Sequence, residues 1–326
     1  MQSSQNDDEP LGLARDRASA EVSVARFAGT GVHIVKDLIP VEEPLECQLA
    51  YGPLNSRRLK SISVTMRTPG HDFELAAGFL MTEGVVRDSA EIERISYVAG
   101  RPTPVEAADE RSQEGSAVLQ YQAERNVVRV ELLPDVSVSL ANLERNFYTT
   151  SSCGICGKAS LLALRTVCPP RATNEFQVTT EVLYSLPARL RDAQNVFDKT
   201  GGLHASGLFG SSGHLFSSRE DVGRHNAVDK LLGTEFLADR TPLRDRLLML
   251  SGRASFELLQ KALMAGVPMV VSVGAPSSLA VQVARDFDIT LVGFLRGDHF
   301  NVYHGAKRVI GTNGSAGDIY ENPHQR

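Results

Sequence analysis

The sequence predicts an α/β protein (α+β overall), in which a C-terminal domain has helices on both faces of a sheet and a smaller N-terminal domain is rich in strands. Two observations lead to this prediction. In the second half of the chain, compact apolar runs at residues 247–250, 269–273 and 289–294 alternate with helical patterns, which is typical of a sheet covered by helices. Between Val32 and Val138, short alternating or β-branched runs indicate strands.

The N-terminal domain is predicted to span residues 26–148, after a polar tail of residues 1–25 that lacks apolar periodicity and is expected to be disordered. Order is expected to begin near Val32. Apolar residues at helical spacing from Phe73 to Thr82, followed by Gly84 as a stop signal, predict one helix packed on the sheet. The expected strands of that sheet lie at residues 45–49, 61–66 and 127–130.

The C-terminal domain is predicted over residues 159–326. Its strands are separated by helical patterns at residues 255–265 and 277–287. A further helix is expected to run to about Phe236, with Asp221 as its N-cap. These elements would cover the sheet on both faces.

The overall composition excludes several classes of function. A chain of 326 residues with 42% hydrophobic and 22% charged residues is typical of a globular protein with a packed core. The formal net charge of -5 argues against a nucleic-acid partner or a membrane surface, because neither would be attracted at long range. No apolar run is long enough to span a bilayer and no signal-peptide pattern is present, so a cytoplasmic location is expected.

The strongest chemical signal is the loop expected at residues 149–158, where Cys153 and Cys156 are separated by two residues. Four cysteines are too few for a disulfide-stabilised secreted protein, so metal or thiol chemistry in a reducing compartment explains this pair better. If Cys153 lies near the start of the helix expected over 159–167, the helix dipole and Lys158 would favour its thiolate. Since the thiolate is the form that attacks sulfur, Cys153 and Cys156 are the predicted catalytic residues.

Alternative roles for this cysteine pair stay open. A structural zinc site needs four ligands, and the remaining candidates are the isolated Cys168 and scattered histidines. A thioredoxin-like exchanger would carry its motif after the first strand of a compact domain. Two buried cysteines are less expected among Ser, Thr, Gly and Lys neighbours. We therefore expect a mobile loop that carries sulfur, and no metal site.

A second group of ionisable residues lies between Arg219 and Lys230. Arg224 and His225 are expected near the N-terminus of a helix, where backbone N–H groups and two basic side chains could bind an anion such as phosphate. In the alternative interpretation, these two side chains only decorate the start of the helix. The sequence leaves both interpretations open, and the glycine-rich segment 200–207 does not decide between them.

A third group follows the last apolar run, and ligands of open α/β sheets bind at such strand ends. Arg296 could bind a phosphate, and Asp298 could accept hydrogen bonds from the N–H edge of guanine. The alternative is a simple β-turn, because Gly-Asp pairs are common in turns. Small-residue loops at 251–255 and 274–278 would lie at the same edge. The predicted cofactor-binding residues are therefore Phe294, Leu295, Arg296, Gly297, Asp298 and His299, together with Arg224 and His225.

Several motifs in this order resemble the FdhD family, the accessory sulfurtransferases required for formate dehydrogenase activity. The resemblance spans nearly the whole chain after the tail. It rests on the segments 152–157, 200–204, 220–230, 251–253 and 294–297, which read SCGICG, TGGLH, EDVGRHNAVDK, SGR and FLRG.

The resemblance implies that a cysteine desulfurase hands a persulfide to the cysteine loop, with Cys153 as the carrier. It implies that the sulfur then passes to the molybdenum bis-guanine-dinucleotide cofactor of formate dehydrogenase, for which a guanine nucleotide such as GDP is a mimic. It further implies a homodimer, cofactor binding by the segment 294–299 and a cytidine-deaminase-like C-terminal domain. Deaminase zinc sites use H-x-E followed by P-C-x-x-C. Here His204 is followed by Ala205 and Ser206, so we expect a deaminase-like frame without that zinc.

Two rival functions stay open. A cofactor chaperone would use the cysteines to ligate or shield the metal and would only bind and deliver the cofactor. A disulfide oxidoreductase would form a reversible bond between Cys153 and Cys156.

Overall fold

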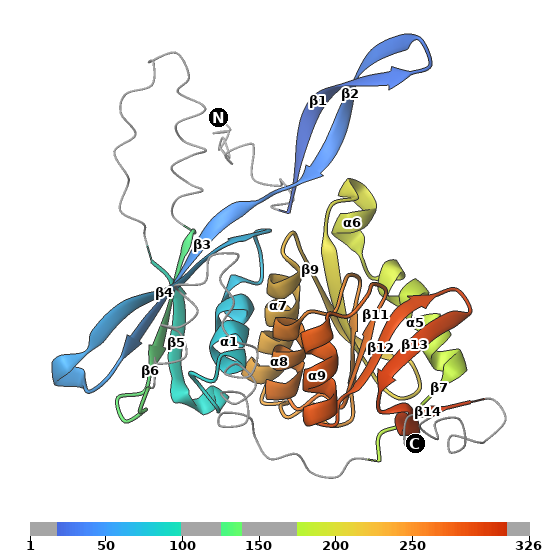
Figure 1. Ribbon diagram of the computed structural model, residues 1–326. Coiled ribbons are helices and arrows are strands. Elements are labelled where there is room, and N and C mark those ends of the chain that lie inside the picture. Colours follow the sequence, from blue (N-terminus) through green and yellow to red (C-terminus); the bar gives the residue numbers. More distant parts are fainter. Residues whose placement is uncertain (1–17, 99–124, 139–174, 312–326) are drawn as a thin grey trace, which may run out of the picture.

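The computed structural model describes residues 18–98, 125–138 and 175–311 (Figure 1). In this part of the chain, a small sheet, a layer of helices, a larger sheet and a second helical layer follow one another. The predicted α/β class, with helices on both faces of a sheet and a strand-rich N-terminal part, is confirmed. Within these residues, no helix has the length and apolar character needed to cross a membrane.

A four-stranded sheet with the order β4-β3-β6-β5 forms the N-terminal part. β3 and β6 are parallel, and the other neighbours are antiparallel. Leu45 and Leu49 face the core, whereas Glu46 and Gln48 between them are partly exposed, which is the alternation expected of a strand. All three predicted strands of this sheet and the predicted helix are therefore confirmed. The elements are β3 (Glu43–Tyr51), β4 (Arg58–Arg67), α1 (Asp72–Thr82), β5 (Ile92–Tyr97) and β6 (Val127–Leu132), with 3-10 turns at Leu54–Ser56 and Ser89–Glu91.

A separate hairpin precedes this sheet and extends away from the body of the protein (Figure 1). It consists of β1 (Ser19–Ala28) and β2 (Gly31–Pro40), which pair along their whole length in an antiparallel register. The predictions of a disordered tail to residue 25 and of order from Val32 are therefore wrong for this segment. Val22 and Val24 alternate with polar residues, and pairing with β2 satisfies the backbone of β1. We call residues 19–40 the arm.

The larger sheet has six strands in the order β13-β12-β11-β10-β8-β9. β10, β11 and β12 are parallel to one another, whereas β8, β9 and β13 run antiparallel to their neighbours. The parallel strands coincide with the predicted apolar runs, because strands that are buried on both faces are continuously apolar. The strands are β8 (His204–Phe209), β9 (Leu215–Asp221), β10 (Leu247–Leu250), β11 (Met269–Ser272), β12 (Thr290–Arg296) and β13 (His299–His304). A short parallel pair is formed by β7 (Val178–Thr179) and β14 (Val309–Ile310), next to a 3-10 turn at Ala306–Arg308.

Helices cover both faces of the larger sheet. α7 (Arg224–Leu237), α8 (Phe256–Met264) and α9 (Ser278–Asp286) pack on one face, and α5 (Thr180–Asp192) packs on the other, followed by the short α6 (Asn195–Thr200). Alternate residues of β10 serve the two cores: Leu248 and Leu250 face α7 to α9, whereas Leu247 and Met249 face α5. The helices predicted at 255–265 and 277–287 are confirmed, while α5 and α6 are additions to the sequence prediction.

The N-terminal part is joined to the larger sheet by a close crossing of α1 and α7. A Cβ atom at Gly233 would lie 1.9 Å from the backbone oxygen of Glu74, and one at Gly78 would lie 2.0 Å from the backbone oxygen of Asp229. No side chain fits at either position without moving backbone. The two glycines therefore let the helices touch, and one continuous apolar core extends from the small sheet to the larger one.

Two buried ion pairs lie next to this crossing. Lys230 Nζ lies 2.7 Å from Asp221 Oδ2, and Lys261 Nζ lies 2.9 Å from Asp229 Oδ1. Burial lowers the pKa of Lys230 and raises that of Asp229. Burial also acts against the charged form of Lys261, but the carboxylates of Asp229 and Glu83 together outweigh it and the pKa of Lys261 is raised. These charges are paired inside the protein and hold its elements together.

Candidate functional site

One edge of the larger sheet gathers several of the predicted binding residues. The parallel strands β10, β11 and β12 end at this edge, and the antiparallel pair contributes the start of β8 and the end of β9, since His204 pairs with Asp221. Carboxyl ends of parallel strands are the usual binding place in such sheets. We call this part of the sheet the ligand edge. It consists of His204, Phe294 and the segments 221–225, 251–253 and 273–276.

The two strand-to-helix loops of the ligand edge are bonded to each other. Gly274 N donates to Gly252 O at 3.0 Å, and Ala254 N donates to Ala275 O at 3.2 Å. A Cβ atom at Gly274 would lie 3.0 Å from the backbone nitrogen of Arg253, so glycine favours this close approach. The prediction that these small-residue loops lie at one edge is confirmed.

A buried carboxylate fixes the start of α7. Asp221 is the last residue of β9, and Gly223 is the N-cap, without a side-chain hydrogen bond. The Asp221 carboxylate accepts hydrogen bonds from the backbone N–H groups of Thr68 and Gly223 at 3.1 and 2.8 Å. It also accepts one from Asn226 Nδ2 at 3.0 Å, in addition to its ion pair with Lys230. The prediction of Asp221 as N-cap is wrong, because strand pairing continues through this residue and turns its carboxylate to the interior.

Arg224 and His225 are the first residues of α7 and lie at the ligand edge. Among the residues that the structure describes, the buried Nε of Arg224 has no hydrogen-bond partner. His225 Nε2 lies 3.4 Å from Ser255 Oγ and 3.9 Å from Glu257 Oε2. Burial and the neighbouring Arg224 lower the pKa of His225 to about 4. The His225 ring is therefore neutral at pH 7.

His204 adds a third basic group to this edge. Its ring lies close to Gly252, where a Cβ atom would be 3.4 Å from Nδ1. Burial lowers the pKa of His204, and the positive charge of Arg224 adds to the effect. Because Arg224 disfavours protonation of both histidines, the three groups form one electrostatic cluster. An anion placed here would neutralise the charge of Arg224 and favour protonation of the rings.

The predicted cofactor segment 294–299 forms the hairpin between β12 and β13. Phe294 lies at the ligand edge, where its backbone N–H donates to Gly274 O at 3.1 Å. Leu295 is fully buried in the core under α5. The turn residues from Arg296 to His299 are exposed, and Gly297 has a φ of 54°. The segment is thus divided between the edge, the core and a solvent-exposed turn.

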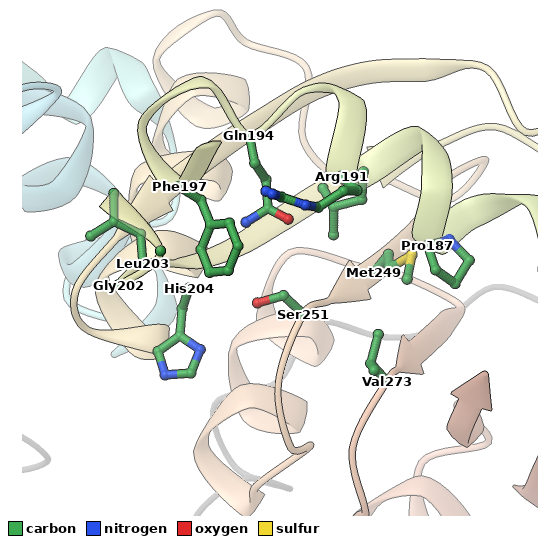
Figure 2. A pocket seen from close by; sticks show the side chains of 12 residues that line it. Pro187, Arg191, Gln194, Phe197, Gly202, Leu203, His204, Met249, Ser251 and Val273 are labelled. Carbon is green, nitrogen blue, oxygen red and sulfur yellow. The ribbon is translucent and has the colours of Figure 1, made fainter. Parts of the chain in front are cut away.

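A cavity of about 550 Å³ opens beside the ligand edge, on the face of the sheet that α5 covers (Figure 2). His204, Ser251 and Val273 line it from the sheet. Gln194 and Phe197, from the start of α6, line it from the opposite side. Arg224, His225 and the segment 294–299 do not line this cavity. Sequence reasoning missed the wall formed by Gln194 and Phe197, because a short helix with one aromatic residue carries no periodic signal.

The predicted catalytic residues Cys153 and Cys156, with the whole loop 149–158, lie outside the described residues, and so does the helix expected over 159–167. Cys47 is described and is a free cysteine, 3% exposed, in the core of the small sheet. Burial raises the pKa of Cys47 to about 12, and nearby carboxylates add to the effect. A buried thiol of this kind is unreactive, so Cys47 does not carry sulfur.

Most of the chain matches one family model, described as the FdhD/NarQ family, over residues 42–310. The chain belongs to this family. A Streptomyces coelicolor protein named "Sulfur carrier protein FdhD" is 48% identical over 295 residues, which cover 90% of this chain and 96% of that protein. Proteins of the same name are 46% identical in Mycobacterium tuberculosis and 35% identical in Saccharolobus solfataricus, over 90% and 84% of this chain and 99% and 91% of theirs.

A crystal structure from Desulfotalea psychrophila, described as a formate dehydrogenase accessory protein, has a similar fold. Its TM-score is 0.64 at 21% identity, with 90% of this chain and 100% of that chain covered. At this identity the likeness concerns the fold alone. The resemblance to the FdhD family is therefore confirmed, whereas the cytidine-deaminase-like frame stays a prediction.

Proposed function

We propose that this protein is a sulfur carrier that accepts persulfide sulfur from a cysteine desulfurase and transfers it to the molybdenum bis-guanine-dinucleotide cofactor required for formate dehydrogenase activity. The observation that carries the proposal is the nearly full-length match to proteins named sulfur carriers, in a chain whose segment 149–158 contains two closely spaced thiols. The similar fold of a protein described as a formate dehydrogenase accessory supports the choice of target.

In the loading step, the Cys153 thiolate attacks the outer sulfur of the donor's cysteine persulfide. A new S–S bond forms on Cys153, the S–S bond of the donor breaks, and the donor leaves as a thiolate. Sulfur moves without net oxidation or reduction. Cys156 then assists release: its thiolate attacks the Cys153 sulfur of the persulfide, the S–S bond of the persulfide breaks, and the outer sulfur leaves to the acceptor as sulfide. The two cysteines are left as a disulfide, which thiol reductants of the cell reduce before the next cycle.

The ligand edge supports the second half of the proposal. The cofactor carries diphosphate groups, and Arg224 offers a guanidinium whose Nε has no partner among the described residues. His225 and His204 lie in the same cluster, so a bound phosphate would recruit their protonated forms. Phe294 and the exposed turn from Arg296 to Asp298 and His299 continue from this edge. We assign the phosphates of the cofactor to the side of Arg224 and His225.

The remaining partners are proposed from the resemblance to the FdhD family. We propose a homodimer that works in the cytoplasm, with a cysteine desulfurase as donor and formate dehydrogenase as the enzyme that receives the sulfurated cofactor. Size measurement by light scattering tests the dimer separately from the sulfur chemistry.

Mass spectrometry tests the relay directly. The wild-type protein, incubated with a cysteine desulfurase and cysteine and then freed of small thiols, is expected to gain the mass of one sulfur atom. Cys153→Ala should abolish this gain, because the attacking thiolate is lost. Cys47→Ala is the matched control, since that thiol is buried and should not be loaded.

A gain of one sulfur that survives Cys153→Ala would refute the role of Cys153. If Cys153→Ala and Cys156→Ala both still supported formate dehydrogenase activity in cells, delivery of the cofactor without sulfur transfer would be the better account.

A further inference from the structure

The cavity of Figure 2 adds Phe197 and Gln194 to side chains that belong to the ligand edge, such as Ser251 and Val273. Phe197 presents an aromatic ring, Gln194 an amide and Ser251 a hydroxyl, and Figure 2 shows these side chains around the same space. Met249 and Val273 add apolar surface on the sheet side. A mostly apolar cavity with a few converging polar groups is typical of a small-molecule site.

A purine base could interact with each of these three polar or aromatic side chains. The ring of Phe197 can stack on the flat face of a base. The amide of Gln194, at 6% residue exposure, can donate and accept side by side, as the edge of a purine requires. Ser251 Oγ already accepts a hydrogen bond from Ala205 N at 2.8 Å, so its proton remains for a ligand.

The aromatic wall is held in place by a carboxylate beneath it. Glu220 accepts hydrogen bonds from the backbone N–H groups of Val196 and Phe197 at 3.0 and 2.8 Å. Arg191 also lines the cavity, and its guanidinium lies 4.3 Å from the ring centroid of Phe197 and pairs with Asp198 at 2.7 Å. The position of Phe197 is therefore fixed before any ligand arrives.

The last two residues of β9, Glu220 and Asp221, form their contacts on opposite faces of the sheet. Successive side chains of a strand point to opposite faces. Glu220 holds the wall of the cavity on the α5 face, while Asp221 holds the start of α7, with Arg224 and His225, on the other. One dipeptide thus sets the distance between the cavity and the basic cluster.

The cavity is also adjacent to the ligand edge, where we assign the phosphates of the cofactor. Ser251 and Val273 line the cavity, and the residues that follow them, Gly252 and Gly274, begin the bonded loops of the ligand edge. A base in the cavity would leave its sugar and phosphates at that edge, next to the basic cluster.

We infer that the cavity lined by Gln194, Phe197 and Ser251 is a subsite for the purine base of a nucleotide, and that Glu220 is a positioning residue for it. The inference rests on the proposed function, because it names where the nucleotide end of the cofactor binds. It places the base away from Asp298, whose side chain is fully exposed in the β12–β13 turn.

Calorimetric binding of GDP, ADP and pyrophosphate to the full-length protein tests the subsite. Phe197→Ala should weaken GDP binding roughly 5- to 150-fold, which is the range expected for one lost base–aromatic stack. Pyrophosphate binding should stay unchanged, because it has no base. Phe197→Leu, which keeps an apolar side chain in the cavity, should also lose most of the stacking effect.

Phe216→Ala is the matched control. Phe216 is another aromatic residue under an arginine, with Arg246 Cζ 3.6 Å from its ring centroid, but it lies at the opposite end of β9 and does not line the cavity. GDP affinity should not change in this variant. An equal loss in Phe197→Ala and Phe216→Ala, or wild-type protein that binds GDP no better than pyrophosphate, would overturn the inference.

Glu220→Ala should weaken GDP binding and leave pyrophosphate binding intact, although its carboxylate touches no ligand. Glu220→Gln keeps one acceptor oxygen, for one of the two N–H groups, and should restore part of the GDP affinity, an effect that a general loss of folding would not produce. If Glu220→Ala weakened both ligands equally, Glu220 would have no specific role in positioning the base subsite.

Sulfur loading of Cys153, measured in the same variants, separates the two proposals. Variants of the cavity should load sulfur like the wild type. Failure of loading in the wild type would remove the relay and leave the GDP result to decide the base subsite by itself.

Discussion

The crossing of α1 and α7 and the ligand edge use the same kinds of side chain in opposite ways. At the crossing, Lys230 and Lys261 each lie within 2.9 Å of a buried carboxylate. At the ligand edge, the buried Nε of Arg224 has no hydrogen-bond partner in the described part of the chain, and His225 approaches Glu257 only to 3.9 Å. Arg224 and Lys230 belong to the same helix, so both situations occur on α7.

The difference teaches how to separate structural charges from charges that are available for a ligand. In a buried ion pair each charge neutralises the other, so removing one partner leaves an unpaired buried charge and destabilises the fold. In the basic cluster, burial and then the charge of Arg224 lower the pKa of His204 and of His225, so both rings are neutral at pH 7. Only the second kind of site changes its protonation when an anion binds.

The largest effect is expected from breaking a pair at the crossing. Lys230→Met leaves the Asp221 carboxylate, which is 0% exposed, without its counter-charge. We expect a loss of about 3–5 kcal/mol in the free energy of unfolding, measured by urea denaturation. The double variant Asp221→Asn with Lys230→Met should recover much of this loss, because neither charge of this pair remains. A single variant as stable as the wild type would show that the pair does not hold the crossing.

A smaller effect is expected from the contact between the helices. Gly233→Ala places a methyl group where a Cβ atom would be 1.9 Å from the Glu74 backbone oxygen, so α1 and α7 must separate. We expect a destabilisation of about 1–3 kcal/mol from overpacking. Gly311→Ala is the control, since a Cβ atom there meets nothing within 4 Å. Equal unfolding midpoints for the two variants would contradict the close crossing.

The smallest effect is expected at the ligand edge and depends on pH. The pKa of His225 falls from 6.5 to about 4 on folding, so the unfolded chain binds more protons between these pH values. Stability therefore decreases as the pH is lowered from about 6.5 towards 4. His225→Gln removes this contribution, and its Tm should fall less than that of the wild type between pH 7 and pH 5. His204 is present in both proteins and cancels in the comparison. Identical shifts in Tm would show that His225 is not held neutral.

Much of the fold could be predicted because local patterns report burial. The runs that became β10, β11 and β12 are mostly apolar, with Ser272 and Thr290 as buried polar exceptions, as expected of strands covered on both faces. The arm was mispredicted for the opposite reason. Its strands bury little, with Phe27 and Ile34 about three-quarters exposed (76% and 75%), so composition suggested a tail. Its order comes mainly from the pairing of β1 with β2.

The site shows the same limit more sharply. The segment 220–230 stands out in the sequence as rich in ionisable residues, yet the pattern assigned Asp221 to a helix cap and left Arg224 and His225 undecided. The structure separates them by their contacts with distant residues. The Asp221 carboxylate accepts a hydrogen bond from Thr68 N, whereas Arg224 lies at the ligand edge and its Nε has no hydrogen-bond partner among the described residues.

The sequence by itself determined the class of fold, three strands of each sheet (β3, β4 and β6, and β10 to β12), the family and the two thiols at Cys153 and Cys156. Tertiary structure alone decided which charges are paired, and it alone brought Gln194 and Phe197 opposite Ser251 to form a cavity. The physical reason is the range of the interactions. Periodicity records whether a residue is buried, whereas an ion pair or a cavity wall requires groups far apart in the chain to meet.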